Sequence, residues 1–225
     1  PIPAASRSSM PSTPDLHRAP RLLWNIVYNG STFANEVIRT GVGGGFNAKD
    51  SVPESTRTGY YLKKLLREDL NLDPVSPSTK KHYDVYMRYT ELYLIYAEAA
   101  NEAWGPDGTG TNGFSARNVI AAIRNRGGIA QPDNYLTSIP TKADMRALIH
   151  NERRIELCFE SFRFWDLRRW NADLTEKVRG VQINGTSYNY VDVEERRYDN
   201  VFMHYGPLPE KEVVKFNALI QNKGW

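Results

Sequence analysis

The chain has 225 residues, a formal net charge of +3 and a pI of about 8.9. This length suffices to bury a sizeable core, and 24% charged with 40% hydrophobic residues is ordinary for a globular protein. The mild charge does not predict a polyanion partner, no run of about twenty apolar residues predicts a membrane span, and the single cysteine, Cys158, excludes an internal disulfide.

The first segment, residues 1–82, is expected to be loop-rich with short strands or helical turns, because Gly, Pro, Ser and Thr are frequent in it. Its first twenty residues resemble a Pro/Ser-rich loop without a secretory signal or an anchoring cysteine, which suggests a fragment of a longer chain. Within the segment, RLLWNIVYNG is typical of a short strand ending in an Asn-Gly turn, and GYYLKKLLRED of a short helix. GVGGGF lacks the strand, spacing and helix of a phosphate-binding loop, so we interpret it as a flexible loop.

The second segment, residues 83–171, is expected to form a core of helical hairpins. In YMRYTELYLIYAEAANEAW, apolar residues recur every three or four positions, which predicts a helix with one apolar face. The residues on this face are Tyr89, Leu92, Ile95, Tyr96, Ala99 and Ala103. The alanines would allow a second helix to approach this face closely. Gly and Pro in WGPDGTGTNG end the helix, and FSARNVIAAIRNRGG predicts another that stops at Gly127-Gly128.

A third helix is predicted by TKADMRALIHNERRIELCFES, with Thr141 as its cap and Asp144 near its positive end. FRFWDLRRW continues this helix or restarts as a short one. Two successive hairpins indicate a mainly α fold of tetratricopeptide-like helical hairpins with long irregular loops and little β structure, although no clean 34-residue repeat is present. We expect at least three long helices in antiparallel hairpins between Tyr83 and Trp170.

The last segment, residues 172–225, is expected to be extended and to dock on the helical core. Pro207 and Pro209 enforce an extended approach, after which Glu210 to Ile220 can form a short amphipathic helix. The side chains expected to be buried are those of Val213, Phe216, Leu219 and Ile220.

Charged side chains occupy the apolar faces of the predicted helices. Glu152 and Glu156 fall within the apolar arc of the third helix, and Arg124 and Arg88 lie among apolar residues before it. Because buried carboxylates need partners, we expect Arg124 or Arg88 to contact Glu152 or Glu156 across a helix interface. A weaker local pair between Arg163 and Glu160, which are three residues apart, is also expected. The expected structural network comprises Arg88, Arg124, Glu152, Glu156, Glu160 and Arg163.

Three glutamates in this region also suggest a catalytic alternative. Glu152, Glu156 and Glu160 lie about one helical turn apart, roughly 6 Å along the axis, which is within the range of glycosidase carboxylate pairs. Each has an arginine within four residues, which favours an ionised, structural carboxylate over a catalytic one. No residue is therefore assigned a catalytic role.

Signals for metal and nucleic-acid sites are weak in this sequence. The sequence offers no metal site among its histidines, which are far apart and form no H-E-x-x-H pattern: His17, His82, His150 and His204. The stretch Asp107 to Gly113 could be a calcium-binding loop or a plain turn. Because it lacks the acid pattern of an EF-hand loop, the plain turn is favoured. The arginines and aromatics of FRFWDLRRW suggest a single-stranded nucleic-acid site or a scaffold, and the neighbouring acids favour the scaffold.

Aromatic residues in or beside loops are the candidate ligand-binding residues. They are Trp24, Tyr60, Trp104 and Tyr188. A flat ring can cover the apolar face of a pyranose while Asn and Arg bond its hydroxyls. The same residue types also fill irregular cores, so a core role stays open for each of them.

Four motifs occur in an order and spacing that resemble the C-terminal half of the SusD/RagB family. They are YTELYLIYAEAANEA, ARNVIAAIRNRGGI, LIHNERRIELCFESFRFWDLRRW and YGPLPEKEVVKFNALIQNKGW. The upstream stretch TGYYLKKLL fits as well, so the resemblance covers about Arg21 to Trp225. Members of this family are about twice as long as this chain, and their ligand contacts follow no fixed motif, so no ligand-binding residue is carried over.

The resemblance implies a mainly helical outer-membrane lipoprotein on the surface of a Gram-negative bacterium. Such a protein would cap a SusC-type TonB-dependent transporter and deliver oligosaccharide or polysaccharide, or in some members peptide, without catalysis or a cofactor. Membrane contact would occur only through a lipid anchor that this chain does not contain. The alternative from the residues themselves is a helical-repeat scaffold that binds a protein or peptide.

Overall fold

The structure, a computed structural model, describes residues 19–71, 73–81, 83 and 85–225. The chain divides into a first unit, Pro1–Arg39 with Tyr61–Cys158, and a second unit, Thr40–Tyr60 with Phe159–Trp225. These units differ from the three consecutive segments described above, because the chain leaves the first unit after Arg39 and returns to it at Tyr61. The Pro/Ser-rich loop expected at the N-terminal end, with His17, and also His82 lie outside the described residues.

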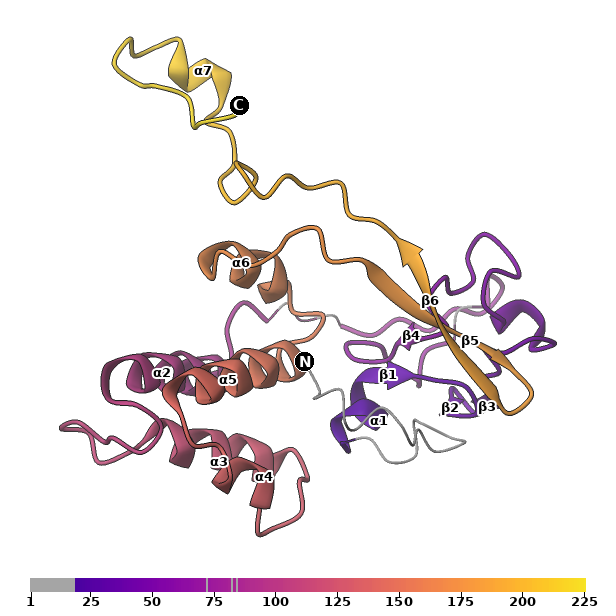
Figure 1. Cartoon of the computed structure of the whole chain (residues 1–225). Helices are drawn as coiled ribbons and strands as arrows, with labels where there is room; N and C mark the ends of the chain where they lie inside the picture. Colours follow the sequence, from indigo (N-terminus) through magenta and orange to yellow (C-terminus); the bar gives the residue numbers. More distant parts are fainter. Residues whose placement is uncertain (1–18, 72, 82, 84) are drawn as a thin grey trace. The chain divides into compact units, whose positions relative to one another are not determined.

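Three long helices form the core of the first unit: α2 (Tyr89–Trp104), α3 (Ala116–Arg126) and α5 (Lys142–Glu156). Two short helices accompany them, α1 (Arg21–Asn25) and α4 (Asn134–Thr137). α2 packs against both α3 and α5, and Figure 1 shows the three long helices side by side. The expectation of at least three long helices in this part of the chain is confirmed, and the fold is mainly α with few short strands.

Hydrogen bonds at both ends of α2 show that its neighbours run antiparallel to it. Near the end of α2, Glu102 accepts bonds of 2.6 Å from Nε and Nη2 of Arg146, which lies in the first half of α5. Near the start of α2, Glu91 accepts a bond of 3.4 Å from Nη2 of Arg153, close to the end of α5. Arg126, the last residue of α3, donates at 2.8 Å to the second residue of α2. Both α3 and α5 therefore pair antiparallel with α2.

Capping side chains set the limits of α3 and α5. Ser115 and Asn118 form a capping box at the start of α3, in which each side chain accepts a bond from the backbone N–H of the other residue. α3 stops directly before Gly127, as the sequence predicts. Thr141 accepts a bond of 3.1 Å from the backbone N–H of Asp144, so the predicted cap of α5 is also confirmed.

The side of α2 that is buried is not the side expected from its apolar residues. The buried residues are Thr90, Glu91, Leu94, Ala97, Ala100 and Asn101. On the expected face, Tyr89 is 71% exposed and Leu92 is 45% exposed. The small side chains of Ala97 and Ala100 let the neighbouring helices approach closely, and Asn101 donates a bond of 3.0 Å to the first backbone carbonyl of α5. The buried side of α2 therefore carries small and polar residues, and its large aromatic side chains lie on the exposed side.

Short strands complete the described part of the first unit. β1 (Ile26–Val27) pairs antiparallel with β4 (Tyr61–Leu62), and β2 (Thr32–Phe33) pairs with β3 (Glu36–Val37). RLLWN forms α1 before the expected strand begins. The short helix expected in GYYLKKLLRED is wrong: the backbone N–H groups of Lys63 and Lys64 donate to the carbonyl of Asn25, and Leu65 has a φ of 70°. These two backbone donors are already bonded to the last residue of α1, so they are not available for a helix in this stretch.

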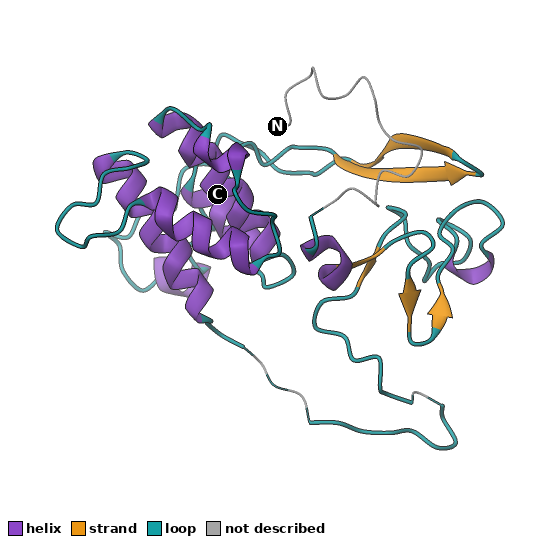
Figure 2. Ribbon diagram, turned by 90° about the horizontal axis from the view of Figure 1, so that it is seen from below, coloured by secondary structure: helices purple, strands orange, loops and turns teal. Residues whose placement is uncertain are grey.

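A two-stranded hairpin is the largest element of the second unit. β5 (Val178–Asn184) and β6 (Ser187–Glu194) are antiparallel and appear as the two long arrows in Figure 2. The stretch Thr40–Tyr60 adds backbone bonds to β5, because the N–H of Val181 donates to Thr58 at 2.8 Å and the N–H of Val42 donates to Ile183 at 2.9 Å. This hairpin was not predicted from the sequence, although an Asn-Gly pair between alternating residues is its usual signal.

The other elements of the second unit are short: η2 (Gly45–Asn47), α6 (Phe162–Arg169) and α7 (Glu210–Val213). α6 restarts the helix after a break, at which Phe159 and Ser161 have φ angles of 63° and 67°. Such left-handed residues cannot belong to a right-handed helix. Among the described residues no helix is both long and apolar enough to cross a bilayer.

The C-terminal segment corrects one expectation from the sequence. α7 ends at Val213 rather than near Ile220, and the next residues form turns. Phe216 is 65% exposed and Ile220 is 84% exposed, while Val213 and Leu219 are half-buried. The expected burial of all four is therefore wrong, because the short helix does not bring them to one face. Docking of this segment on the helical hairpins stays a prediction.

Candidate functional site

A buried carboxylate joins three helices of the first unit. Glu152 on α5 is 1% exposed. Its Oε1 accepts a bond of 2.5 Å from Nη1 of Arg124 on α3, and its Oε2 accepts one of 2.7 Å from Nη2 of Arg21 on α1. Charge-assisted bonds of this kind are the strong ones in proteins, and each guanidinium fixes one oxygen. The Arg124–Glu152 contact expected from the sequence is present, and Arg21 is an additional partner.

Asp133 extends this cluster towards α4. Nε and Nη2 of Arg124 donate to the two carboxylate oxygens of Asp133, the second at 3.2 Å. One of these oxygens also accepts a bond of 3.1 Å from the backbone N–H of Leu136, so Asp133 caps α4. The side-chain hydrogen bond from Arg124 is the main reason that the pKa of the Asp133 carboxyl lies below its usual value.

The lowered pKa of Asp133 predicts a loss of stability in acid. Its folded pKa lies below the ordinary value of 3.8, so its stabilising effect is complete above about pH 3.8 and disappears as the pH falls through the folded pKa. Asp133→Asn should thus be less stable than the parent protein at neutral pH, and the difference should shrink below about pH 3.8. Urea unfolding between neutral pH and pH 2.5 measures this. A difference that stays constant over the whole range would contradict the assignment.

A second carboxylate, Glu156 at the end of α5, collects four cationic side chains. Its Oε2 lies 3.3 Å from Nη1 of Arg21, and its Oε1 lies 3.1 Å from Nη1 of Arg88 and also accepts a bond from Arg126. Its backbone carbonyl accepts bonds of 2.8 Å from both Lys64 and Arg88. Cations are favoured here because the last carbonyls of a helix carry partial negative charge. The expected contact between Arg88 and Glu156 is present.

These cationic side chains surround a pocket of about 300 Å³, at the lower end of the range for ligand sites. The lining residues are Arg21, Trp24, Asn25, Lys64, Arg88, Arg126, Gly127 and Glu156. We call this cavity the Trp24 pocket. Trp24 is 57% exposed and is one of the residues that line the pocket. The pocket thus combines an accessible flat ring, an amide side chain and several guanidinium or ammonium donors.

The other three candidate ligand-binding residues lie elsewhere. Trp104, at the end of α2, is 45% exposed and its ring lies against Gly110, where an added Cβ would approach it to 2.4 Å. Its ring is therefore partly covered by its own loop. Tyr60 and Tyr188 are half-buried residues of the second unit. A ligand-binding role for these three residues stays a prediction.

Several members of the ionic cluster were not predicted from the sequence. Arg21, Lys64 and Arg126 all contact Glu156, and Arg153 contacts Glu91 within the helical core. No periodic signal could have assigned Arg21, because it belongs to a five-residue helix far from α5 in the sequence. Arg126 could have been predicted as a member, because it lies at the end of the same predicted helix as Arg124. The predicted Glu160 to Arg163 pair stays a prediction.

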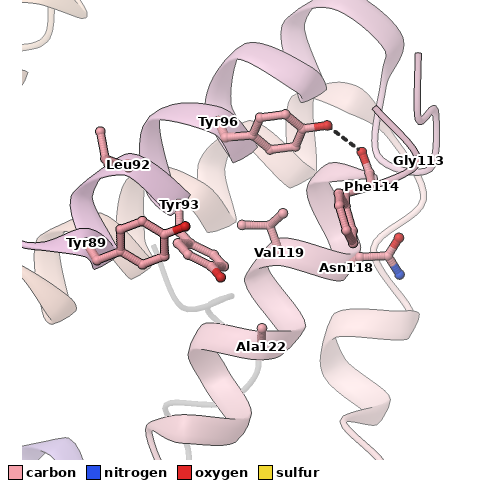
Figure 3. A pocket seen from close by; sticks show the side chains of 9 residues that line it. All are labelled: Tyr89, Leu92, Tyr93, Tyr96, Gly113, Phe114, Asn118, Val119 and Ala122. Carbon is pink, nitrogen blue, oxygen red and sulfur yellow. Dashed lines mark hydrogen bonds between the residues drawn. The ribbon is translucent and has the colours of Figure 1, made fainter. Parts of the chain in front are cut away.

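A larger aromatic groove lies between α2 and α3, with a volume of about 820 Å³ (Figure 3). Its lining residues are Tyr89, Leu92, Tyr93, Tyr96, Gly113, Phe114, Asn118, Val119 and Ala122, and none of these nine described residues carries a charge. Tyr89 and Tyr93 form an edge-to-face pair with centroids 5.1 Å apart, and the Tyr96 hydroxyl donates to the carbonyl of Phe114 at 2.8 Å. We call this surface the aromatic groove. It is the side of α2 that was expected to be buried.

The alternative chemistries gain little support from the geometry. Glu152 and Glu156 both accept bonds from guanidinium groups, as structural carboxylates do. Both carboxylate oxygens of Asp107 accept bonds from Arg117, at 2.7 and 2.9 Å, which favours a plain turn over a calcium loop. Among the described residues, no three acidic, histidine or cysteine side chains are grouped as metal ligands.

Comparison with known proteins adds independent information. The model of the SusD family matches residues 3–225. A SusD-like protein, P38, of Formosa agariphila is 34% identical over 122 residues, which are 52% of this chain and 22% of that protein. Two solved proteins of Bacteroides fragilis are similar in structure: a SusD-like protein with a TM-score of 0.69 and 27% identity, and a SusD-like carbohydrate binding protein with a TM-score of 0.64 and 25% identity.

These similarities extend over most of this chain but over a minor part of each relative. The alignments cover 92% and 89% of this chain, and 39% and 41% of the two solved proteins. The chain therefore spans well under half the length of the proteins that it matches.

Proposed function

The chain belongs to the SusD family, and from this premise we propose that the protein binds an extracellular glycan and passes it intact to a SusC-type TonB-dependent transporter. The ligand would be an oligosaccharide or a segment of a polysaccharide. One of the similar solved proteins is described as a carbohydrate binding protein, which supports this class of ligand. The place of action would be the outer surface of the outer membrane, through a lipid anchor. The location and the transporter partner rest on family membership alone.

The Trp24 pocket is the observation that carries the proposal within this chain. Its exposed indole ring offers a face for the apolar side of a pyranose, and Asn25 lies beside it at the pocket lining. Arg88, directly before α2, and Arg126, the last residue of α3, supply N–H donors for ring hydroxyls. An aromatic face with convergent polar groups is the usual composition of a small-ligand site.

Binding without bond cleavage fits the carboxylates of the same region. A glycosidase needs one protonated and one ionised carboxyl group flanking the substrate. Glu156 lines the pocket, but three guanidinium groups already hold its two carboxylate oxygens. Glu152 is buried beneath two further guanidinium bonds. Neither group is placed to donate a proton to a bound sugar.

The aromatic groove supports a second candidate function, the binding of a protein or peptide. An uncharged groove of this volume, lined by exposed aromatic rings, suits the apolar face of an amphipathic helix better than a hydroxyl-rich sugar. The protein would then act as a helical-repeat scaffold.

Calorimetric titration of the intact protein separates these functions. The panel would contain neutral and charged oligosaccharides together with peptides, and the products would be analysed by chromatography after long incubation. Saturable binding of a saccharide with no new product is the expected result. Released smaller sugars would instead indicate a hydrolase, and binding of peptides with silence towards every saccharide would indicate the scaffold.

A further inference from the structure

We propose that Asn112 is a site of spontaneous covalent modification, at which its side-chain amide is lost and an aspartate or isoaspartate is formed through a cyclic imide. Asparagine followed by glycine occurs at three places in the chain: Asn29–Gly30, Asn112–Gly113 and Asn184–Gly185. The structure restrains the first and the third of these pairs and leaves the second exposed and without such restraint.

The reaction needs only the two residues and water. The backbone nitrogen of Gly113 attacks the side-chain carbonyl carbon of Asn112 and forms a C–N bond. The bond from that carbon to the amide nitrogen breaks, and the amide leaves as ammonia together with the proton of the attacking nitrogen. Water then opens the cyclic imide at either of its two carbonyl groups. Asparagine is among the chemically labile residues, and a following glycine hinders ring closure least because it has no Cβ.

Asn112 and Gly113 lie in the loop that joins α2 to α3, and both are exposed. Among the residues that the structure describes, neither the Asn112 side chain nor the Gly113 backbone N–H has a hydrogen-bond partner. An added Cβ on Gly113 would meet nothing within 4 Å, so the space around this residue is open. The amide carbon can therefore rotate towards the attacking nitrogen without breaking a hydrogen bond of either group.

The two other Asn-Gly pairs are held by backbone structure. The N–H of Gly30, which would be the attacking group, donates to the carbonyl of Ile38 at 2.8 Å. Asn184 is the last residue of β5 and is paired with Ser187 of β6 in the hairpin ladder. At both places the local structure must open before the ring can close, and this opening costs free energy.

The related Asp107–Gly108 pair in the same loop is restrained as well. Both carboxylate oxygens of Asp107 accept bonds from Arg117, at 2.7 and 2.9 Å. Gly108 lies so close to Trp104 that an added Cβ would be 2.4 Å from the carbonyl oxygen of that residue. The unrestrained part of this loop is thus its end, at Asn112 and Gly113.

The modification would change the surface next to the aromatic groove. Gly113 and Phe114 line this groove, and its nine lining residues carry no charge. The product would place a carboxylate directly before them in the chain. The isoaspartate form would also insert an additional carbon into the backbone close to Phe114, whose carbonyl accepts the bond of 2.8 Å from the Tyr96 hydroxyl.

Peptide mapping by mass spectrometry tests the proposal after incubation of the intact protein at mildly alkaline pH. In the folded protein we expect Asn112 to lose its amide at least about tenfold faster than Asn29 and Asn184, because only the latter two must open first. In guanidinium chloride the three pairs should react at similar rates, since unfolding removes the restraints. A rate at Asn112 no higher than at the other two in the folded protein would overturn the proposal, and so would an equally large advantage in denaturant.

A matched pair of variants assigns the modification to Asn112. Asn112→Gln should suppress the acidic species that accumulate on anion exchange, because glutamine would have to close a larger and less favoured ring. Asn184→Gln should retain the parent pattern, and both substitutions are at exposed residues, where the effect on stability is small. Equal accumulation of acidic species in the parent protein and in Asn112→Gln would place the reaction elsewhere and overturn the proposal.

Discussion

Replacing Glu152 with glutamine is expected to lower the free energy of unfolding by about 3 to 5 kcal/mol, the usual effect of removing one member of a buried ion pair. Glu152 is 1% exposed, and its two oxygens hold Arg21 and Arg124. A glutamine keeps the shape of the side chain, but its NH₂ group must face one of the two guanidinium groups. One buried guanidinium then loses one of its acceptors. Arg124 keeps only Asp133 as a carboxylate partner, and Arg21 keeps only Glu156.

The matched control for this change is Glu102→Gln. Glu102 also contacts two cations, Arg146 and Lys142, but its side chain is 39% exposed. Surface ion pairs contribute about 0 to 1 kcal/mol, so this variant should remain close to the parent protein. Urea unfolding monitored by circular dichroism measures both variants. Equal and small effects would show that Glu152 does not organise the helical core.

Gly59→Ala is expected to have the second large effect, at the junction between Thr40–Tyr60 and β5. Gly59 has a φ of 83°, and an added Cβ would lie 2.4 Å from the carbonyl oxygen of Val181. The neighbouring backbone bond from Val181 to Thr58 is 2.8 Å long and holds the segment against the strand. The methyl group would have to displace backbone, which is stiffer than a side chain. We expect a loss of about 1 to 2 kcal/mol from the unfavourable φ and about 1 to 3 kcal/mol more from the clash.

Gly43→Ala separates these two contributions. Gly43 belongs to the same stretch and has a similar φ of 81°, but nothing lies within 4 Å of an added Cβ. This variant should therefore show only the effect of the backbone conformation, about 1 to 2 kcal/mol. Thermal and urea unfolding of the two variants would be compared directly. Equal losses would mean that the close approach to β5 is not needed for stability.

The helices of the first unit were predictable from local sequence. α3 and α5 follow from capping residues, Gly127 and a regular apolar spacing, all of which act within a few residues. The contacts from Arg124 to Glu152 and from Arg88 to Glu156 followed from one further argument, that a carboxylate on an apolar arc needs a partner. Both inferences depend on short-range periodicity and on strong chemical preferences.

The features that were not predicted depend on contacts between residues far apart in the sequence. Arg21 meets Glu152 across 131 positions of the chain, and nothing in the local sequence indicates that separation. The buried side of α2 is set by two partner helices, so Ala97 and Ala100 were favoured over the larger Tyr89 and Leu92. Burial of a helix face depends on what packs against it as well as on its own hydrophobicity. The Trp24 pocket has the same origin, since its walls come from α1, from Lys64 after β4, from Arg88 directly before α2, and from the ends of α3 and α5.

The affinity of Trp24→Ala for the saccharide that the panel identifies is the most direct test of the account. Trp24 is 57% exposed, so its removal should leave the free energy of unfolding nearly unchanged. Trp165→Ala is the matched control, because Trp165 on α6 is a similarly exposed tryptophan, at 65%, that does not line the pocket. We predict that Trp24→Ala weakens binding at least about tenfold, as expected for an aromatic anchor, while Trp165→Ala retains the parent affinity. Equal affinities of the two variants for the saccharide would contradict the assignment of the glycan site to the Trp24 pocket.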